Sequence, residues 1–169
     1  MSIIETDRLE LSEFSLNDAP FILEMLNDPA WLQFIGDRGV KTLDDARDYI
    51  ENKLQKSFKE LGFGMLIVKL KDGGISIGTC GLLKRDYLED LDLGFAFLPE
   101  FRGKGYAFEA ASATIEYGKE NLGMKRILAF TDADNFASII LIKKLGLEFE
   151  RLIDFPDDDA EIQLYGVDT

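Results

Sequence analysis

The chain has 169 residues, of which 46% are hydrophobic and 11% aromatic, so it can bury a substantial core and is not a disordered or low-complexity protein. Its formal net charge of −13 excludes the clustered basic surface that nucleic-acid binding requires. The charge favours a cationic partner, although acidity also serves solubility alone. Histidine is absent, which excludes Ser-His-Asp triads, Cys-His dyads and His-ligated zinc sites, and we expect no bound metal.

Cysteine usage and the terminal sequence indicate the compartment. Cys80 is the single cysteine, so no intramolecular disulfide can form and a reducing compartment is expected. The first ten residues lack the basic segment and apolar core of a signal peptide. The longest apolar run, residues 136–142, is shorter than the roughly 20 residues of a membrane span. We therefore expect a cytoplasmic protein with no membrane partner, either a monomer or a homodimer.

Hydrophobic periodicity divides the chain into helices and strands. Pro29 ends the first helix, because the residue before a proline is pushed out of the helical region. Thr42 is a predicted N-cap, and Asp45 completes a weak capping box. In chain order we predict a strand at 9–14, a helix at 18–26, a loop containing Trp31 and Phe34, a helix at 42–61 with one apolar face from Leu43 to Leu61, a hairpin of strands at 65–70 and 75–83, a strand at 91–98, a glycine-rich turn at 102–107, a helix at 108–121, a strand at 126–131, a helix at 136–145 and two strands around Phe149 and Leu164.

This order of elements predicts an α+β fold with a central mixed sheet. No repeat or Ser/Pro-rich linker interrupts it, so residues 1–169 are expected to form a single domain. Asp157, Asp158 and Asp159 fall between the last two strands. They are expected in a solvated loop, with an acidic substrate rim as the alternative.

The most informative segment is the glycine-rich turn in LGFAFLPEFRGKGYA. Gly103 and Gly105 let successive backbone N–H groups converge before a helix whose N-terminus adds partial positive charge. Arg102 and Lys104 add full charges, so the turn suits a pyrophosphate. Phe108 stands where a Rossmann fingerprint needs a small residue, and no G-x-x-x-x-G-K-S/T sequence occurs. The turn is therefore neither of the standard nucleotide-binding motifs.

A second segment begins just after the predicted strand at 126–131. Asn135 occupies an N-cap position, and a plain cap is a sufficient explanation for it. Ser138 lies one turn into the helix, where an exposed serine is as good an explanation as a functional one. The two segments together are more specific than either alone.

The pair of segments resembles the GNAT acetyltransferase superfamily. Residues 102–107, RGKGYA, match its R-x-x-G-x-G/A signature, and residues 135–147 resemble its N-x-x-S-x-x-x-x-x-K-x-G-F segment. The opening TDRLEL, the turn at 27–29 and Glu109-Ala110 are similar to the branch of ribosomal-protein N-terminal acetyltransferases. The resemblance spans nearly the whole chain and implies a GNAT-like, mostly antiparallel central sheet with a splayed parallel strand pair and flanking helices.

The resemblance also implies roles by position. In the family, the wedge between the splayed strands holds the pantetheine arm of acetyl-CoA, one backbone N–H of the wedge polarises the thioester carbonyl, and the glycine-rich turn holds the pyrophosphate. The cofactor-binding residues implied in this way are Phe95, Phe97, Leu98, Arg102, Gly103, Lys104, Gly105, Tyr106, Ala107 and Asn135.

The catalytic residues follow the family less closely. Many members carry a tyrosine acid seven residues after the Asn, where this chain has Ile142. The ribosomal branch is similar in lacking it, and there a serine at the position of Ser138 is thought to stabilise the departing thiolate. Asp92 is the candidate general base, since the branch usually has a carboxylate there, with a solvent-facing strand residue as the alternative. Cys80 has no basic neighbour and is expected to be a buried structural thiol, which favours direct transfer.

The acceptor side is less well defined. Trp31 and Phe34 lie where the branch forms one wall of its acceptor groove, or else they cap the core. Glu13, Asp28 or Asp37 are candidates for an acidic lining of that groove.

The function implied is acetyl-CoA-dependent N-acetylation of a primary amine. An α-amine with a pKa of about 7.7–8.0 is neutral in roughly one molecule in ten at pH 7, against roughly one in 2500 for a lysine side chain. A site poor in strong bases therefore favours the N-terminal α-amine of a protein such as a ribosomal protein. The alternatives are a cationic small molecule, such as a polyamine or an aminoglycoside, and a non-catalytic acyl-CoA-binding module.

Overall fold

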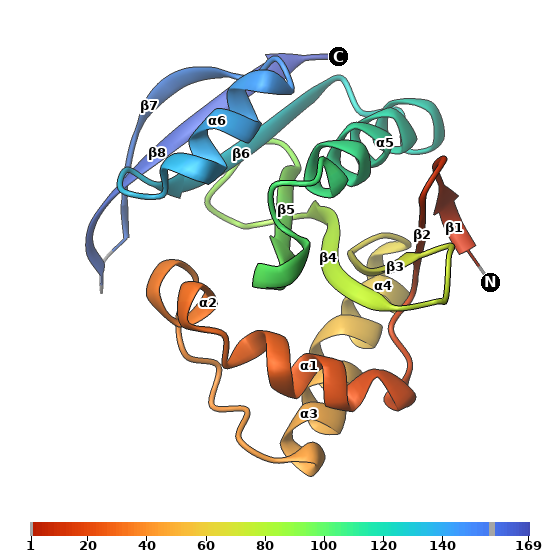
Figure 1. Ribbon diagram of the computed structural model, residues 1–169. Helices are drawn as coiled ribbons and strands as arrows, with labels where there is room; N and C mark the ends of the chain where they lie inside the picture. The colour runs from red at the N-terminus through yellow and green to blue at the C-terminus, as the bar shows by residue number, and fades with distance from the viewer. Residues whose placement is uncertain (1, 156–157) are drawn as a thin grey trace.

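One eight-stranded sheet runs through the molecule in the order β1-β2-β3-β4-β5-β6-β8-β7. The computed structural model describes residues 2–155 and 158–169, and α5 and α6 lie together on one face of the sheet (Figure 1). The elements are β1 (Ser2–Glu5), β2 (Leu9–Ser12), η1 (Leu16–Asp18), α1 (Ala19–Leu26), α2 (Pro29–Phe34), α3 (Leu43–Tyr49), η2 (Ile50–Gln55), α4 (Lys56–Leu61), β3 (Met65–Leu70), β4 (Ser76–Leu83), β5 (Asp92–Phe97), η3 (Pro99–Phe101), α5 (Tyr106–Asn121), β6 (Arg126–Asp132), α6 (Phe136–Lys144), β7 (Glu148–Phe155) and β8 (Asp158–Asp168).

The core has two main parts, one on each face of the sheet. Successive side chains of a strand point to opposite faces, and β3 shows this directly. Leu66 and Val68 belong to a cluster with Ala110 of α5, whereas Ile67 between them belongs to a cluster with Ile22 of α1. The predicted α+β fold with a mixed, mostly antiparallel sheet is confirmed.

The splayed strand pair is confirmed by the register. β5 and β6 are parallel and pair at Asp92 and Leu128, where Leu128 N–H donates to Leu91 O at 2.9 Å. Within residues 92–97 and 126–132, all of which the structure describes, this is the one registered pair. The strands therefore start side by side and diverge toward their carboxyl ends, which leaves a wedge that closes at Asp92.

The first 61 residues hold most of the differences from the predicted elements. β1 was not predicted, and its place as an edge strand depends on pairing with β2. The expected loop with Trp31 and Phe34 is the helix α2, for which Asp28 is the N-cap and accepts a hydrogen bond from Ala30 N–H at 3.1 Å. Pro29 ends α1 as predicted, but it is also the first residue of α2, a position that suits its fixed φ.

The helical segment from Leu43 to Leu61 begins as predicted and then changes its pitch. Thr42 and Asp45 form the predicted capping box. Ala46 and Ile50 are buried, but Leu43 and Leu61 are 41% and 44% exposed. The π-helical stretch η2 has i→i+5 bonds and rotates later residues away from the face that 3.6-residue spacing predicts. The single apolar face predicted from Leu43 to Leu61 is therefore wrong at Leu61. It is also wrong at Leu43, which precedes η2 and is exposed on the first turn of α3.

The prediction of a loop at residues 157–159, the acidic run near the C-terminus, is also corrected by the structure. The backbone of Asp158 and Asp159 lies in β8, so the predicted loop does not extend over these two residues. Asp157 lies outside the described residues. The remaining predicted elements match the observed ones to within two or three residues.

Candidate functional site

The open edge of β5 presents main-chain groups to the wedge. β5 pairs with β4 along its whole length, and in an antiparallel ladder alternate residues bond to one neighbour while the others face away. Leu98 N–H donates to Ile77 O at 3.0 Å, so the alternation turns the N–H and C=O groups of Phe95 and Phe97 toward β6. Because β6 has already diverged there, these groups line the wedge.

Leu98 fits the implied cofactor role less well than its neighbours. Its N–H is engaged with Ile77, and its carbonyl accepts from Phe101 N–H at 3.0 Å. It cannot offer an N–H to a ligand without giving up a bond of the sheet. The carbonyl of Phe97 accepts from Arg102 Nε at 2.9 Å, so the N–H of Phe97 and both groups of Phe95 are the ones directed into the wedge.

The glycine-rich turn has the backbone conformation that its sequence predicts. Gly103 and Gly105 have φ values of +74° and +84°, in the left-handed region that glycine adopts without strain. The first hydrogen bond of α5 runs from Glu109 N–H to Gly105 O at 3.1 Å, so the N–H groups of Tyr106 and Ala107 lie ahead of it at the helix start. A Cβ on Gly103 would meet no atom within 4 Å. These open, positively polarised backbone groups fit a pyrophosphate.

A cluster of contacts that sequence reasoning missed, here called the clamp, joins Thr6 and Arg8 to Glu109 and to the turn. Arg8 donates from its Nε to Glu109 Oε1 at 2.8 Å and from its Nη1 to Lys104 O at 3.1 Å, and its guanidinium stacks 4.4 Å from the centre of the Tyr106 ring. Thr6 Oγ1 also donates to Glu109. Burial acts to raise the pKa of Glu109, but the hydrogen bonds from Thr6 and Arg8 outweigh it and hold the pKa below its ordinary value.

The signal for this clamp was present in the sequence. TDRLEL and Glu109-Ala110, the two segments similar to the ribosomal-protein branch, stand about 100 residues apart in the chain. The structure shows that Thr6, Arg8 and Glu109 are in contact.

The charged side chains of the turn do not both face a ligand. Arg102 donates from its Nε to Phe97 O at 2.9 Å and from its Nη2 to Asp28 Oδ2 at 3.0 Å, so its guanidinium links the end of β5 to the start of α2. Lys104 is exposed, and its Nζ lies 5.9 Å from the centre of the Phe101 ring. The contribution of Arg102 to the turn is therefore its backbone and a structural link, while Lys104 remains available to an anion.

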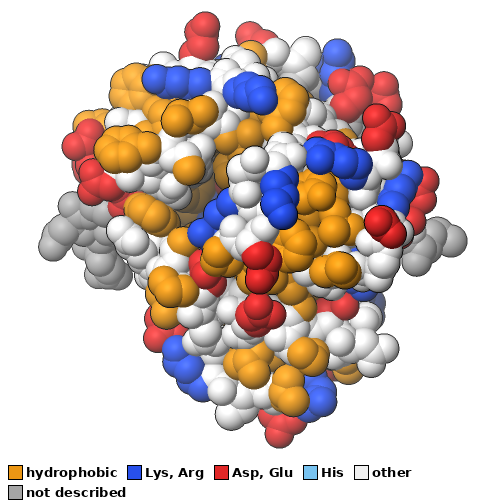
Figure 2. Space-filling view, viewed as in Figure 1, with side chains coloured by type: hydrophobic (Ala, Val, Ile, Leu, Met, Phe, Trp, Pro, Cys, Tyr) orange, Lys and Arg blue, Asp and Glu red, His pale blue; other side chains and the backbone are white. Residues whose placement is uncertain are grey.

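The other side of the wedge is formed by α6. Asn135 is its N-cap, with Oδ1 accepting from Ser138 N–H at 3.3 Å, and both residues are half-buried. Phe136 and Ile140 on the same helix are 69% and 67% exposed. Figure 2 shows hydrophobic and basic side chains gathered over α6, with a hollow between this helix and the segment that follows β5. The hollow corresponds to the open end of the wedge.

Asp92 is buried at the closed end of the wedge. Its side chain is 2% exposed and accepts from Arg85 Nε at 2.9 Å, which excludes a solvent-facing strand residue. Burial raises the pKa of Asp92 above its ordinary value, although the Arg85 guanidinium opposes this. Arg85 also donates to Tyr87 Oη at 3.2 Å and stacks 4.7 Å from the centre of the Phe130 ring.

Asp92 and Ser138 belong to different ends of the wedge. The rise of about 3.3 Å per strand residue puts Asp132 about 13 Å along β6 from Leu128, the partner of Asp92. The chain then turns through Asn135 into α6, which folds back over the sheet (Figure 1). The structure thus brings the turn, Asn135 and Ser138 to the open end and Asp92 to the closed end.

Comparison with known families decides the identity of this arrangement. Residues 8–148 match the family described as the acetyltransferase (GNAT) domain. The chain belongs to the GNAT acetyltransferase family. Figure 1 shows how the splayed pair and the turn before α5, on which the resemblance rested, come together in this GNAT fold.

Individual relatives agree with the family. The chain is 32% identical over 148 residues to YnaD of Bacillus subtilis, an uncharacterized N-acetyltransferase, and the match covers 87% of this chain and 83% of YnaD. Its fold is similar to that of the ribosomal alpha-N-protein acetyltransferase RimL in complex with coenzyme A, with a TM-score of 0.84, 15% identity and coverage of 99% and 98%. It is also similar to spermidine N-acetyltransferase from Vibrio cholerae, with a TM-score of 0.78, 16% identity and coverage of 96% of each chain.

Two buried side chains, Ile142 and Cys80, limit which groups of this GNAT protein can take part in proton transfer or acyl transfer. Ile142, at the position where many members carry tyrosine, is 1% exposed and supplies no proton. Cys80 is fully buried against Thr114 Oγ1 at 3.4 Å, and burial raises the pKa of its thiol to about 12. The expectation of a structural thiol is confirmed.

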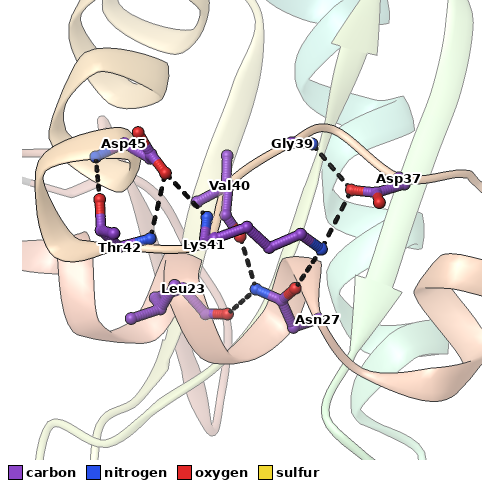
Figure 3. Close-up of polar contacts among 8 residues, drawn as sticks. All are labelled: Leu23, Asn27, Asp37, Gly39, Val40, Lys41, Thr42 and Asp45. Atoms are coloured by element: carbon purple, nitrogen blue, oxygen red, sulfur yellow. Dashed lines mark hydrogen bonds and ion pairs between the residues drawn. The ribbon is translucent and has the colours of Figure 1, made fainter.

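The loop between α2 and α3 is anchored to α1. Lys41 Nζ contacts Asn27 Oδ1 at 3.1 Å and Asp37 Oδ1 at 3.3 Å, and Asn27 Nδ2 donates to Val40 O at 2.8 Å (Figure 3). Of the acidic residues considered for an acceptor groove, Asp37 is thus paired with Lys41 and Asp28 with Arg102. Glu13 is exposed.

Two further findings concern only the part of the chain that the structure describes. Residues 2–155 and 158–169 hold no group of three Cys, Asp or Glu side chains arranged to bind a metal ion. No helix among these residues is both long enough and apolar enough to cross a membrane.

Proposed function

We propose that this protein transfers the acetyl group of acetyl-CoA to the α-amine at the N-terminus of a protein, such as a ribosomal protein. The observation that carries the proposal is the wedge with its adjoining turn. Free-edge backbone groups at Phe95 and Phe97 suit the amides of a pantetheine arm. The turn at 102–107 suits the pyrophosphate, because the positive φ values of Gly103 and Gly105 let successive backbone N–H groups converge.

The reaction requires two proton movements at groups bonded to the same acetyl carbonyl carbon. The amine nitrogen forms a bond to the acetyl carbonyl carbon and loses a proton, while the carbon–sulfur bond breaks and the sulfur gains a proton. Asp92 is our candidate base, since burial raises its pKa and makes it a better proton acceptor than an ordinary carboxylate. Ser138, half-buried on the first turn of α6, is the candidate donor to the sulfur. The N–H of Phe97 or Phe95 is the candidate donor to the carbonyl oxygen.

The α-amine is favoured because the candidate base is a carboxylate, which remains a weak base even with its pKa raised by burial. Asp92 is held by Arg85, and Ile142 occupies the place of a tyrosine. Such a site suits an amine that is neutral in roughly one molecule in ten at pH 7 better than a lysine side chain. The net charge of −13 supports a second candidate, a cationic small molecule such as a polyamine or aminoglycoside. Proteins of similar fold include both a ribosomal alpha-N-protein acetyltransferase and a spermidine N-acetyltransferase.

The proposal is tested in two steps. Acetyl-CoA, NAD and ATP are titrated separately into the protein by calorimetry. We expect binding of acetyl-CoA alone, with a stabilisation near 2.7 kcal/mol at about 100 times Kd. Peptides copying ribosomal-protein N-termini and spermidine are then offered as acceptors, and products are identified by mass spectrometry. Acetylation at the peptide α-amine is the expected result. An unchanged melting temperature at millimolar acetyl-CoA, or acetylation of spermidine alone, would overturn the proposal.

A further inference from the structure

The carbonyl oxygen of Lys104 in the glycine-rich turn is bound by a side chain from the start of the chain. Arg8 Nη1 donates to Lys104 O at 3.1 Å, although the two residues are 96 positions apart. The ion pair of Arg8 with Glu109 uses Nε, so the bond to Lys104 is a separate contact. An exposed ion pair contributes little to stability, and the Arg8 side chain is 45% exposed. The bond to Lys104 is thus better explained by its effect on the turn than by stability.

Arg8 is itself held in place. Its main-chain N–H donates to Glu109 Oε2 at 3.0 Å and its Nε donates to Glu109 Oε1 at 2.8 Å. Its main-chain carbonyl accepts from Lys71 N–H at 2.9 Å, and its guanidinium stacks 4.4 Å from the centre of the Tyr106 ring. Backbone and side chain are both fixed, so the guanidinium sets the orientation of the peptide group that it binds.

The bond to Arg8 decides the direction of the peptide group between Lys104 and Gly105. In a trans peptide the C=O and the N–H lie in one plane and point in opposite directions. Because the C=O of Lys104 points to Arg8, the N–H of Gly105 points away from it. Gly105 is exposed, and its N–H donates to no main-chain acceptor within residues 2–155 and 158–169. This N–H is therefore open to a ligand.

The direction away from Arg8 is the side of the wedge. Arg8 comes directly before β2, and in the sheet order β2 and β6 stand on opposite sides of β5. The turn follows β5 and η3, and the wedge lies between β5 and β6. Arg8 thus reaches the turn from the side opposite the wedge, so the N–H of Gly105 is turned toward the wedge.

We propose that Arg8 is a positioning residue for the acyl donor, because by holding Lys104 O it aims the N–H of Gly105 at the pyrophosphate of acetyl-CoA. The inference rests on the donor named in the proposed function and deepens it. Glycine has a wide range of accessible backbone conformations, so the turn does not fix this peptide group by itself. Without Arg8 the peptide group would be free to rotate and to turn the oxygen of Lys104, the negative end of its dipole, toward the phosphates. Arg8 acts through this peptide group and not by contact with the donor.

The test measures the affinity for acetyl-CoA by calorimetry in the unchanged protein and in four variants. Arg8→Met removes the charge and every donor of the side chain. Arg8→Lys keeps the charge, but a single ammonium group cannot take the places of both Nε and Nη1. Arg8→Met combined with Glu109→Gln removes the carboxylate that Arg8→Met alone leaves without its arginine. Arg47→Met is the matched control, because Arg47 is 49% exposed and pairs with Asp44 at 2.9 Å on α3.

We expect the Kd for acetyl-CoA to rise about tenfold in Arg8→Met, which corresponds to the loss of one hydrogen bond to a charged group. Arg8→Lys should lose nearly as much affinity, because the charge remains while the bond to Lys104 O is lost. The combined variant should stay as weak as Arg8→Met, and Arg47→Met should bind acetyl-CoA as the unchanged protein does.

A second readout follows the amide of Gly105 directly. In ¹⁵N-labelled protein with assigned resonances, the amide proton of Gly105 should move downfield when coenzyme A saturates the site, because a phosphate oxygen accepts its hydrogen bond. The movement should be smaller in Arg8→Lys at saturation. A role of Arg8 in stability alone would leave this movement unchanged in a folded variant, and a thermal melt checks the fold of each variant.

Four results would overturn the inference. These are an unchanged Kd in Arg8→Met, full affinity in Arg8→Lys, recovery of affinity in the combined variant, or an amide proton of Gly105 that does not move when coenzyme A saturates the unchanged protein. The last result needs no variant, so it decides the inference even where a variant fails to fold. With normal acetyl-CoA binding in the unchanged protein, each of these results refutes the role of Arg8 alone, whereas absent binding there refutes the proposed function itself.

Discussion

The turn at 102–107 and the helix α2 lie on two sides of the same ion pair, yet they present chemistry in different ways. The turn offers main-chain N–H groups, held by the φ values of two glycines and by the start of α5. α2 instead carries two aromatic side chains, Trp31 and Phe34, on a six-residue helix none of whose residues is fully buried. A main-chain site is specified by a short sequence signature, because glycine spacing dictates backbone geometry. A side-chain site depends on what packs around it.

The largest expected effect tests the main-chain side of this comparison. Gly105→Glu should lower acetyl-CoA affinity at least 100-fold, because it places a Cβ in the left-handed region and a carboxylate at the start of α5. Its Cβ would lie 3.3 Å from Arg8 Nη2, so the clamp would also be disturbed. Calorimetry measures the affinity and circular dichroism checks the fold. Lys104→Ala is the milder companion, and equal losses in both variants would show that the charge of Lys104 matters more than the backbone.

The next effect separates chemistry from binding on α6. Ser138→Ala should lower kcat and kcat/KM together by about 10- to 1000-fold with acetyl-CoA affinity unchanged, since the hydrogen bond that we propose from its hydroxyl to the sulfur would strengthen only in the transition state. Asn135→Ala should instead weaken acetyl-CoA binding and cost about 1 kcal/mol of stability, because its Oδ1 caps α6. Steady-state kinetics and calorimetry on both variants decide the assignment. Full kcat in Ser138→Ala would return that serine to an ordinary helix residue.

A smaller effect sharpens how the turn is supported. Glu109→Gln should reduce stability by about 1 kcal/mol at pH 7, because it removes the charge that accepts from Thr6 and Arg8. The pKa of Glu109 is lowered in the folded state, so its contribution is complete above the unfolded value of 4.5 and is lost as the pH falls through the folded value. Urea unfolding of both proteins should therefore show a difference at pH 7 that shrinks below about pH 4. A pH-independent difference would show that packing, and not the carboxylate, is responsible.

The smallest expected effect is an absence of reactivity. With a pKa of about 12, the thiol of Cys80 is ionised in roughly one molecule in ten thousand at pH 8, and it is fully buried. Iodoacetamide should leave the native protein unmodified over hours and alkylate it completely in denaturant, as followed by mass spectrometry. Acetylation of Cys80 during turnover would contradict direct transfer.

Several features followed from the sequence because they are local. The hairpin at 72–74, the capping box of Thr42 and Asp45, and the turn with Gly103 and Gly105 each depend on residues within a few positions of one another. The strands at 65–70 and 76–83 likewise follow from short apolar runs between turn signals. The fold class follows from the order of these elements.

Other features came only from the tertiary structure, because the contacts join distant parts of the chain. Arg8 and Glu109 are 101 residues apart, and Arg102 and Asp28 are 74 apart, so no local pattern reveals that they bind one another. From the sequence, the guanidinium of Arg102 was expected to bind a phosphate. In the structure it forms an ion pair with Asp28 instead. Local preferences fix backbone conformation within a turn or a helix, whereas the partner of a long charged side chain is chosen by packing. For that reason the sequence by itself determined the fold and the main-chain turn, and the tertiary structure decided the burial of Asp92 and the partner of Arg102.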